Sequence, residues 1–163
     1  MTKIGDIVFV QTKGICEVKN ITKNAFDGCD KTKEYYVLKP IDSPNNMMVY
    51  FPTDTKIQIR SLSSKSDAEK LLKNFASLSE IVVDSEETRF SNYDSVLKSG
   101  SLENWCRLLK TLLIRKSQVQ KKQFNVQEQK HINTLLSCVL AEFSYVLGKT
   151  KEEINEAIFS CVV

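Results

Sequence analysis

The residues best suited to chemistry are few in this sequence. His131 is the only histidine, and it lies beside the apolar stripe of an expected helix, where a packed histidine is more common than a catalytic base or a metal ligand. The cysteines are scattered and form no C-x-x-C pair, so we interpret them as reduced, mostly packed thiols. They are Cys16, Cys29, Cys106, Cys138 and Cys161. A metal site is therefore not expected.

Catalytic motifs are also missing from the sequence. It contains no nucleophile elbow and no glycine-rich phosphate loop, and it has 5 glycines in all. The acidic pairs Glu86-Glu87 and Glu152-Glu153 are adjacent, and neighbouring side chains on a helix point about 100° apart. Acids in a first helical turn complement the helix dipole, so we interpret both pairs as helix starts. These patterns argue against an enzyme, and no cofactor or small-molecule substrate is expected.

Positive charge is concentrated in residues 104–141, where Glu128 is the only acid. Side chains from two helices that flank a connection can converge on neighbouring phosphates. DNA binding is one interpretation of this cluster, and an ordinary solvated face is the other. Nothing in the sequence has the pattern of a base-reading helix-turn-helix or zinc finger. The basic residues are Arg107, Lys110, Arg115, Lys116, Lys121, Lys122 and Lys130.

The first 60 residues have the pattern of short strands. β-Branched and aromatic residues fill the runs 7–10, 15–21, 35–38, 48–51 and 57–59, and turn residues separate them. Five short strands in so few residues predict a small barrel of the SH3 or Tudor-like kind. The run 48–51 is apolar at every position, which predicts either burial on both faces or an exposed edge that pairs with a partner's strand.

After the strands, the Ser-rich stretch 61–66 is a predicted linker, and residues 67–163 have helical periodicity. Asn125 with Glu128 has the spacing of a capping box, Thr150 with Glu153 repeats it, and Gly148 stands where a helix should end. The sequence thus predicts an α+β chain: a β barrel over residues 1–60, a linker over 61–66 and an all-α bundle over 67–163.

Hydrophobic runs in the chain are short. None approaches the length of a membrane span, and the start lacks the apolar stretch of a secretory signal. We therefore expect a cytoplasmic protein that does not bind membranes.

Several motifs resemble a known family. The segments IGDIV at 4–8, EYYVL at 34–38 and MVYFP at 48–52, together with the Gly14 turn, are similar to the RNA polymerase-interacting module shared by CarD-like regulators and the transcription-repair coupling factor.

The helical half carries its own part of the resemblance. Arg89-Phe90, LKSG at 97–100 and the segment 125–143 resemble the CarD helical domain, in the same order along the chain. The stretch between Lys116 and Phe124 is a few residues longer than is usual in that domain.

The resemblance implies two binding surfaces and no catalytic activity. An exposed strand would bind the polymerase β subunit, and this role falls on Met48, Val49, Tyr50, Phe51 and Pro52. Upstream promoter DNA would be contacted by the helical domain. The residues expected there are Arg89, Phe90, Arg115, Lys116, Lys121, Lys122 and Lys130.

One position departs from the family pattern. Many members place a tryptophan shortly before the Arg-aromatic pair, where it wedges against the opened duplex. Here that position is Glu87, and an acid would repel phosphate instead of stacking on a base. The only tryptophan, Trp105, falls in an apolar stripe where the family has an aliphatic core residue.

The function expected from these features is that of a bacterial transcription regulator that binds RNA polymerase and makes nonspecific contacts with promoter DNA during initiation. The alternative is a polymerase-bound adaptor whose helical domain binds protein instead of DNA.

Overall fold

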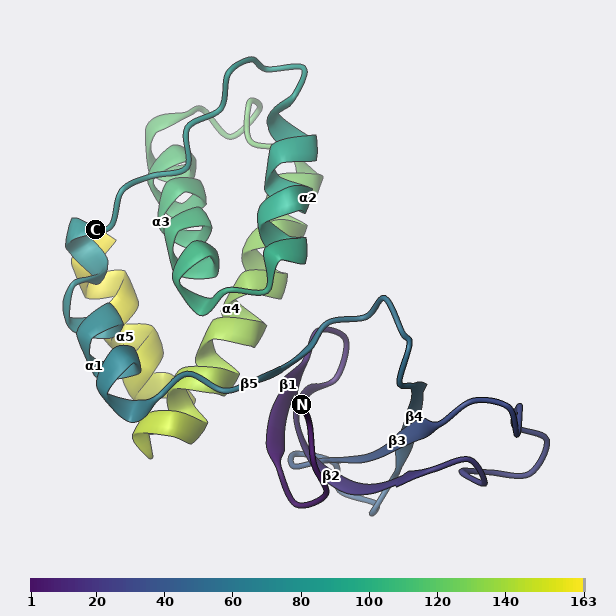
Figure 1. Cartoon of the computed structure of the whole chain (residues 1–163). Coiled ribbons are helices and arrows are strands. Elements are labelled where there is room, and N and C mark those ends of the chain that lie inside the picture. Colours follow the sequence, from purple (N-terminus) through teal and green to yellow (C-terminus); the bar gives the residue numbers. More distant parts are fainter. Residues whose placement is uncertain (163) are drawn as a thin grey trace. The chain divides into compact units, whose positions relative to one another are not determined.

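The computed structural model describes residues 1–162, which fall into two compact units (Figure 1). The first unit ends at Leu62 and contains a β-sheet, and the second begins at Ser63 and is helical. The predicted α+β class is therefore confirmed.

The sheet of the first unit is antiparallel, with the strand order β4-β3-β2-β1-β5. Its two ends, β4 and β5, are not paired with each other in the part of the chain that the structure describes, so the sheet is open and the predicted barrel closure is not confirmed. The strands are β1 Ile7–Val10, β2 Gly14–Thr22, β3 Tyr35–Pro40, β4 Val49–Pro52 and β5 Ile59–Ser61.

One face of the sheet forms the core of this unit. Alternate residues of a strand point to the same face, and the inward positions of β1, β2 and β3 are apolar. A register shift between Val18 and Asn20 marks a bulge in β2, which lets the sheet bend around this core. The buried residues of this core cluster are Val8, Val10, Cys16, Val18 and Leu38.

Two strands begin later than predicted. Met48 precedes β4, which begins at Val49. The last strand begins at Ile59, two residues later than the start of the predicted run, because the Ile57 N–H donates to the Thr55 hydroxyl at 3.1 Å in a local turn. Ile57 still packs against the core, which explains its apolar character.

Helices make up the second unit, and α3 contacts α2, α4 and α5. The predicted stripe that begins at Trp105 is core: this residue and Leu108, Leu109 and Leu112 are all buried. The helices are α1 Lys65–Lys73, the short 3₁₀ helix η1 Phe75–Ser77, α2 Arg89–Ser99, α3 Leu102–Gln118, α4 Val126–Leu147 and α5 Lys151–Val162.

Local capping sets the limits of these helices. Asn125 and Glu128 form the predicted capping box at the start of α4. Gly148 ends that helix with a φ of +64°, a left-handed conformation that glycine adopts without strain. At the start of α5 the Thr150 N–H donates to Glu153, and the Glu153 N–H donates to the Thr150 hydroxyl.

Residues 1–162 contain neither a membrane-spanning helix nor a metal-binding cluster. None of the helices found there is long and apolar enough to cross a membrane. The same residues contain no group of three or more His, Cys, Asp or Glu side chains that could hold a metal ion.

Candidate functional site

The first candidate surface is the outer edge of β4. Among residues 1–162 this strand pairs with β3 alone, through a regular register that joins Val37 to Tyr50 and Tyr36 to Phe51. The opposite side of β4 therefore presents backbone groups to solvent, which is the arrangement that a partner's strand needs for sheet extension.

The backbone bond between Thr53 and Glu34 determines which residues of β4 face this open edge. The Thr53 N–H donates to the Glu34 carbonyl at 2.9 Å, just beyond the pair of Tyr35 and Pro52. Antiparallel pairs alternate between bonded and non-bonded positions, so Pro52 and Tyr50 occupy non-bonded positions. The N–H and C=O of Tyr50 therefore point away from β3, and the missing N–H of Pro52 leaves the ladder intact.

Side chains of β4 divide between the two faces of the sheet. Val49 and Phe51 pack against the buried core of the unit. Tyr50 points to the other face and is 39% exposed, with its ring centroid 5.3 Å from that of Phe26. Phe26 is exposed too, and it also contacts Tyr35 at 5.5 Å. The open backbone edge is thus bordered by an exposed aromatic pair, Tyr50 and Phe26.

The second candidate surface comes from the basic cluster, and its centre is an internal acid. Glu128 is fully buried at the start of α4. Its Oε1 lies 2.6 Å from the Nε of Arg115 on α3 and 3.7 Å from the Nε of Arg89 on α2. Its Oε2 accepts the Asn125 N–H at 3.0 Å. The carboxylate therefore ties the ends of three helices together.

The predicted DNA residues Arg89 and Phe90 belong to this internal cluster. The Arg89 side chain is 10% exposed and also pairs with Glu86 at 2.5 Å. Its guanidinium lies 5.2 Å from the Phe90 ring centroid, and that ring stacks on His131. His131, which the sequence placed beside an apolar stripe, is buried and its Nε2 lies 3.1 Å from Asp94. In this conformation the positive charge of Arg89 is largely neutralised by carboxylates.

Two other cations of the basic cluster donate hydrogen bonds to backbone carbonyls. Lys110 donates to the carbonyls of Ala76 and Leu78, at 2.7 and 2.6 Å. Arg107 donates from Nε to the Ser79 carbonyl at 3.0 Å. Both side chains fix η1 and the residues that follow it against α3.

The remaining lysines are exposed and form what we call the lysine surface: Lys116, Lys121, Lys122 and Lys130. Lys116 closes α3, Lys121 and Lys122 lie in the connection 119–125, and Lys130 lies near the start of α4. No carboxylate within residues 1–162 pairs with any of the four. Their charge is therefore available to a polyanion.

The two buried cysteine thiols, Cys16 and Cys106, are poorly suited to nucleophilic chemistry. Burial raises the pKa of Cys16 to about 11, against a smaller opposing effect of Lys13. Burial also raises the pKa of the Cys106 thiol well above its ordinary range. Because the thiolate is the nucleophile, both groups are inert at neutral pH.

Comparison with known families concerns the unit that contains β4. Residues 2–63 match the family of the CarD-like/TRCF RID domain. The first unit is a CarD-like RNA polymerase-interacting domain. The match covers all five strands of this RID domain and ends before α1. No curated protein matches the chain.

Within the RID domain, one exposed residue was missed in the sequence. Phe26 lies between the predicted strands 15–21 and 35–38, beside the turn residues Asp27 and Gly28, and its apolar side chain is unusual in such a turn. An aromatic residue in a polar turn is a usable signal, but only the fold brings Phe26 beside Tyr50.

Proposed function

We propose that this chain is a bacterial cytoplasmic transcription regulator that binds the RNA polymerase β subunit through β4 of the RID domain. The observation that carries the proposal is the open β4 edge, where the backbone N–H and C=O of Tyr50 face outward. A strand of the β subunit pairs with this edge, and Met48, Val49, Tyr50, Phe51 and Pro52 line the contact. The family match to a polymerase-interacting domain supports this assignment.

The second part of the proposal is contact between the helical domain and upstream promoter DNA. The lysine surface supplies exposed cations without a base-reading motif, so the contacts are with phosphates and sequence specificity is weak. Binding to polymerase raises the local concentration of promoter DNA, which lets weak contacts influence initiation. The lysine surface is positioned by residues of the internal cluster. Arg89 and Arg115 act through their ion pairs with Glu128, and Phe90 acts through its stacking on His131.

The alternative function is a polymerase-bound adaptor whose helical domain binds protein. Exposed apolar side chains in the helical unit, such as Val82, Val126 and Tyr145, favour this second candidate. The salt dependence of DNA binding separates the two functions, because counterion release makes phosphate contacts strongly sensitive to salt.

The polymerase contact is tested by titrating the full chain with the isolated β-subunit lobe. Tyr50→Glu should weaken binding at least tenfold and leave the melting temperature unchanged, since the charge is solvated in the free chain but buried in the complex. Ile4→Glu is the matched control. Ile4 is 61% exposed and precedes β1, and β3 and β2 separate β1 from β4 in the sheet. Unaltered binding by Tyr50→Glu would refute the role of β4.

A further inference from the structure

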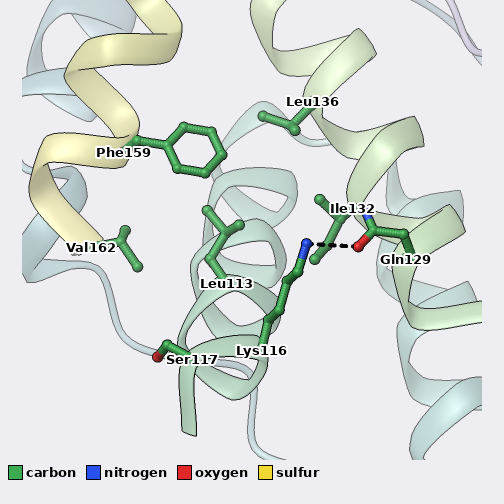
Figure 2. Close-up of a pocket in the computed structure, with 8 residues that line it drawn as sticks. All are labelled: Leu113, Lys116, Ser117, Gln129, Ile132, Leu136, Phe159 and Val162. Carbon is green, nitrogen blue, oxygen red and sulfur yellow. Dashed lines mark hydrogen bonds between the residues drawn. The ribbon is translucent and has the colours of Figure 1, made fainter. Parts of the chain in front are cut away.

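A pocket of about 320 Å³ opens among α3, α4 and α5, and neither proposed binding surface explains its apolar walls (Figure 2). Its walls are apolar: Leu113 comes from α3, Ile132 and Leu136 from α4, and Phe159 from α5. Figure 2 shows the ring of Phe159 directed toward Leu136, with Leu113 between the helices. The volume lies at the lower end of the range of about 300–1,000 Å³ that is typical of small-molecule sites.

The rim of this pocket is polar on one side only. Lys116 Nζ donates to Gln129 Oε1 at 2.8 Å, and Gln129 Nε2 donates to Asn133 at 2.9 Å. An ammonium has three N–H groups and an amide has two, so both side chains keep donors for a ligand. The nearby Ser117 hydroxyl donates to the Ile114 carbonyl at 2.7 Å, so its proton is already used. The rim therefore offers donors and one positive charge.

The positive charge of Lys116 at the rim favours a negatively charged ligand. In the described part of the chain no carboxylate pairs with Lys116. A ligand that fits must bury an apolar chain against the walls and present a group that only accepts hydrogen bonds and carries a single negative charge. An ionised carboxylate meets both requirements at the rim, whereas an alcohol lacks the charge and an amine would be repelled.

We propose that this pocket binds a small carboxylic acid with an apolar chain, such as a medium-chain fatty acid. The carboxylate accepts hydrogen bonds from Lys116 and Gln129, and the chain lies against Leu113, Ile132, Leu136 and Phe159. Lys116 also belongs to the lysine surface, but carboxylate binding is measured without polymerase or DNA, so the outcome of the test does not depend on the proposed function.

Calorimetric titration of the full chain with three probes of equal chain length tests the proposal: decanoate, decanol and decyltrimethylammonium, each below its micelle concentration. Decanoate should bind about three- to tenfold more tightly than decanol, as expected for a partly exposed charged hydrogen bond, and the cation should bind most weakly. Methyl NMR shifts should change at Leu113, Ile132 and Leu136. Equal affinities for decanoate and decanol, or shift changes confined to other methyl groups, would overturn the proposal.

Two variants separate the charge from the apolar walls. Lys116→Gln should remove the preference for decanoate over decanol. Lys149→Gln makes the same charge change just before the start of α5, whereas the pocket residue Phe159 lies near its end, and should keep the preference. Leu136→Trp should fill the pocket and weaken all three probes. Lys116 is exposed, so its variant folds, and an unchanged preference in Lys116→Gln refutes the proposal even if Leu136→Trp misfolds.

Discussion

The Arg115 Nε lies 2.6 Å from Oε1 of Glu128, a carboxylate that is fully buried. The same carboxylate accepts the Asn125 N–H and attracts Arg89, so one acid stabilises the starts of α2 and α4 against α3. Arg89 and Arg115, which the sequence predicts as DNA contacts, therefore contribute to the folding of the helical unit.

Replacing the buried acid should destabilise this unit strongly. Glu128→Gln leaves Arg115 and Arg89 without their shared carboxylate, and breaking a buried ion pair costs about 3–5 kcal/mol. We expect the lower end of that range, because a quarter of the Arg115 side chain is exposed to solvent (24%). Urea denaturation of the full chain measures the change. Glu156→Gln, an exposed position on α5, is the control, and equal stability of the two variants would contradict the role given to Glu128.

The lysine surface should dominate the salt dependence of DNA binding. In the double variant Lys121→Gln/Lys122→Gln, the slope of log affinity against log salt should fall by about 2, since each phosphate contact contributes about 0.9. The melting temperature should not change, because neither lysine has an ion-pair partner among the residues that the structure describes.

The matched control for this double variant is Lys73→Gln/Lys149→Gln, which removes the same charge from exposed positions elsewhere in the helical unit. Fluorescence anisotropy with a short duplex at several salt concentrations gives both slopes. Equal slopes for the two double variants would favour the adaptor function, in which the helical domain does not bind DNA.

Local sequence signals were sufficient for the helical unit. The sequence places Trp105 in an apolar stripe, and this residue is buried; the Asn125 capping box and the Gly148 helix end are predicted from residues at most three positions apart. Such signals depend on neighbours along one helix, so they can be detected without knowledge of the fold.

The internal role of the arginines could not be predicted in the same way. Glu128 was recognised as a capping residue, but Arg115 and Arg89 reach it from two other helices, and only their packing brings the three together. Burial of a charged residue depends on such partners, whereas the sequence alone makes any arginine look solvated. Barrel closure is not confirmed for a related reason, since strand count does not determine whether β4 and β5 meet.

The tryptophan of α3 should act as a core residue. Trp105 is 2% exposed and its indole N–H donates to the Leu97 carbonyl at 3.1 Å. Trp105→Ala should therefore destabilise the chain by about 3–5 kcal/mol, the usual cost of such a cavity. Thermal melts check this, with Tyr145→Ala, 46% exposed on α4, as a control. A fully folded Trp105→Ala variant that lost promoter opening would instead make Trp105 the wedge that the family carries near Glu87.

Thiol reactivity should follow burial. At pH 7.5 iodoacetamide should alkylate the exposed Cys161 and leave Cys106 and Cys16 unmodified, because burial raises the pKa of the Cys16 thiol to about 11 and that of Cys106 further. Peptide mass spectrometry after timed quenching measures each site, and the urea-unfolded chain, in which all five cysteines should react, is the control. Early modification of Cys16 would show that the core of the RID domain opens readily.

Because the Tyr50 N–H points away from β3, proline should have different effects at positions 50 and 51. Tyr50→Pro removes an N–H that the β3 pairing does not use, so the chain should stay folded, whereas Phe51→Pro removes an N–H from a bonded pair and should destabilise the sheet. Tyr50→Ala loses the same side chain but keeps the N–H. We expect Tyr50→Pro to bind the β-subunit lobe about two- to twelvefold more weakly than Tyr50→Ala, the effect of one intermolecular hydrogen bond of about 0.5–1.5 kcal/mol. Circular dichroism and calorimetric titration measure folding and binding.

If Tyr50→Pro unfolds, the Tyr50 N–H is bonded to β3 and the assigned direction is wrong. If the proline and alanine variants fold and bind equally, the β subunit does not extend the sheet at β4, and side chains alone make the contact.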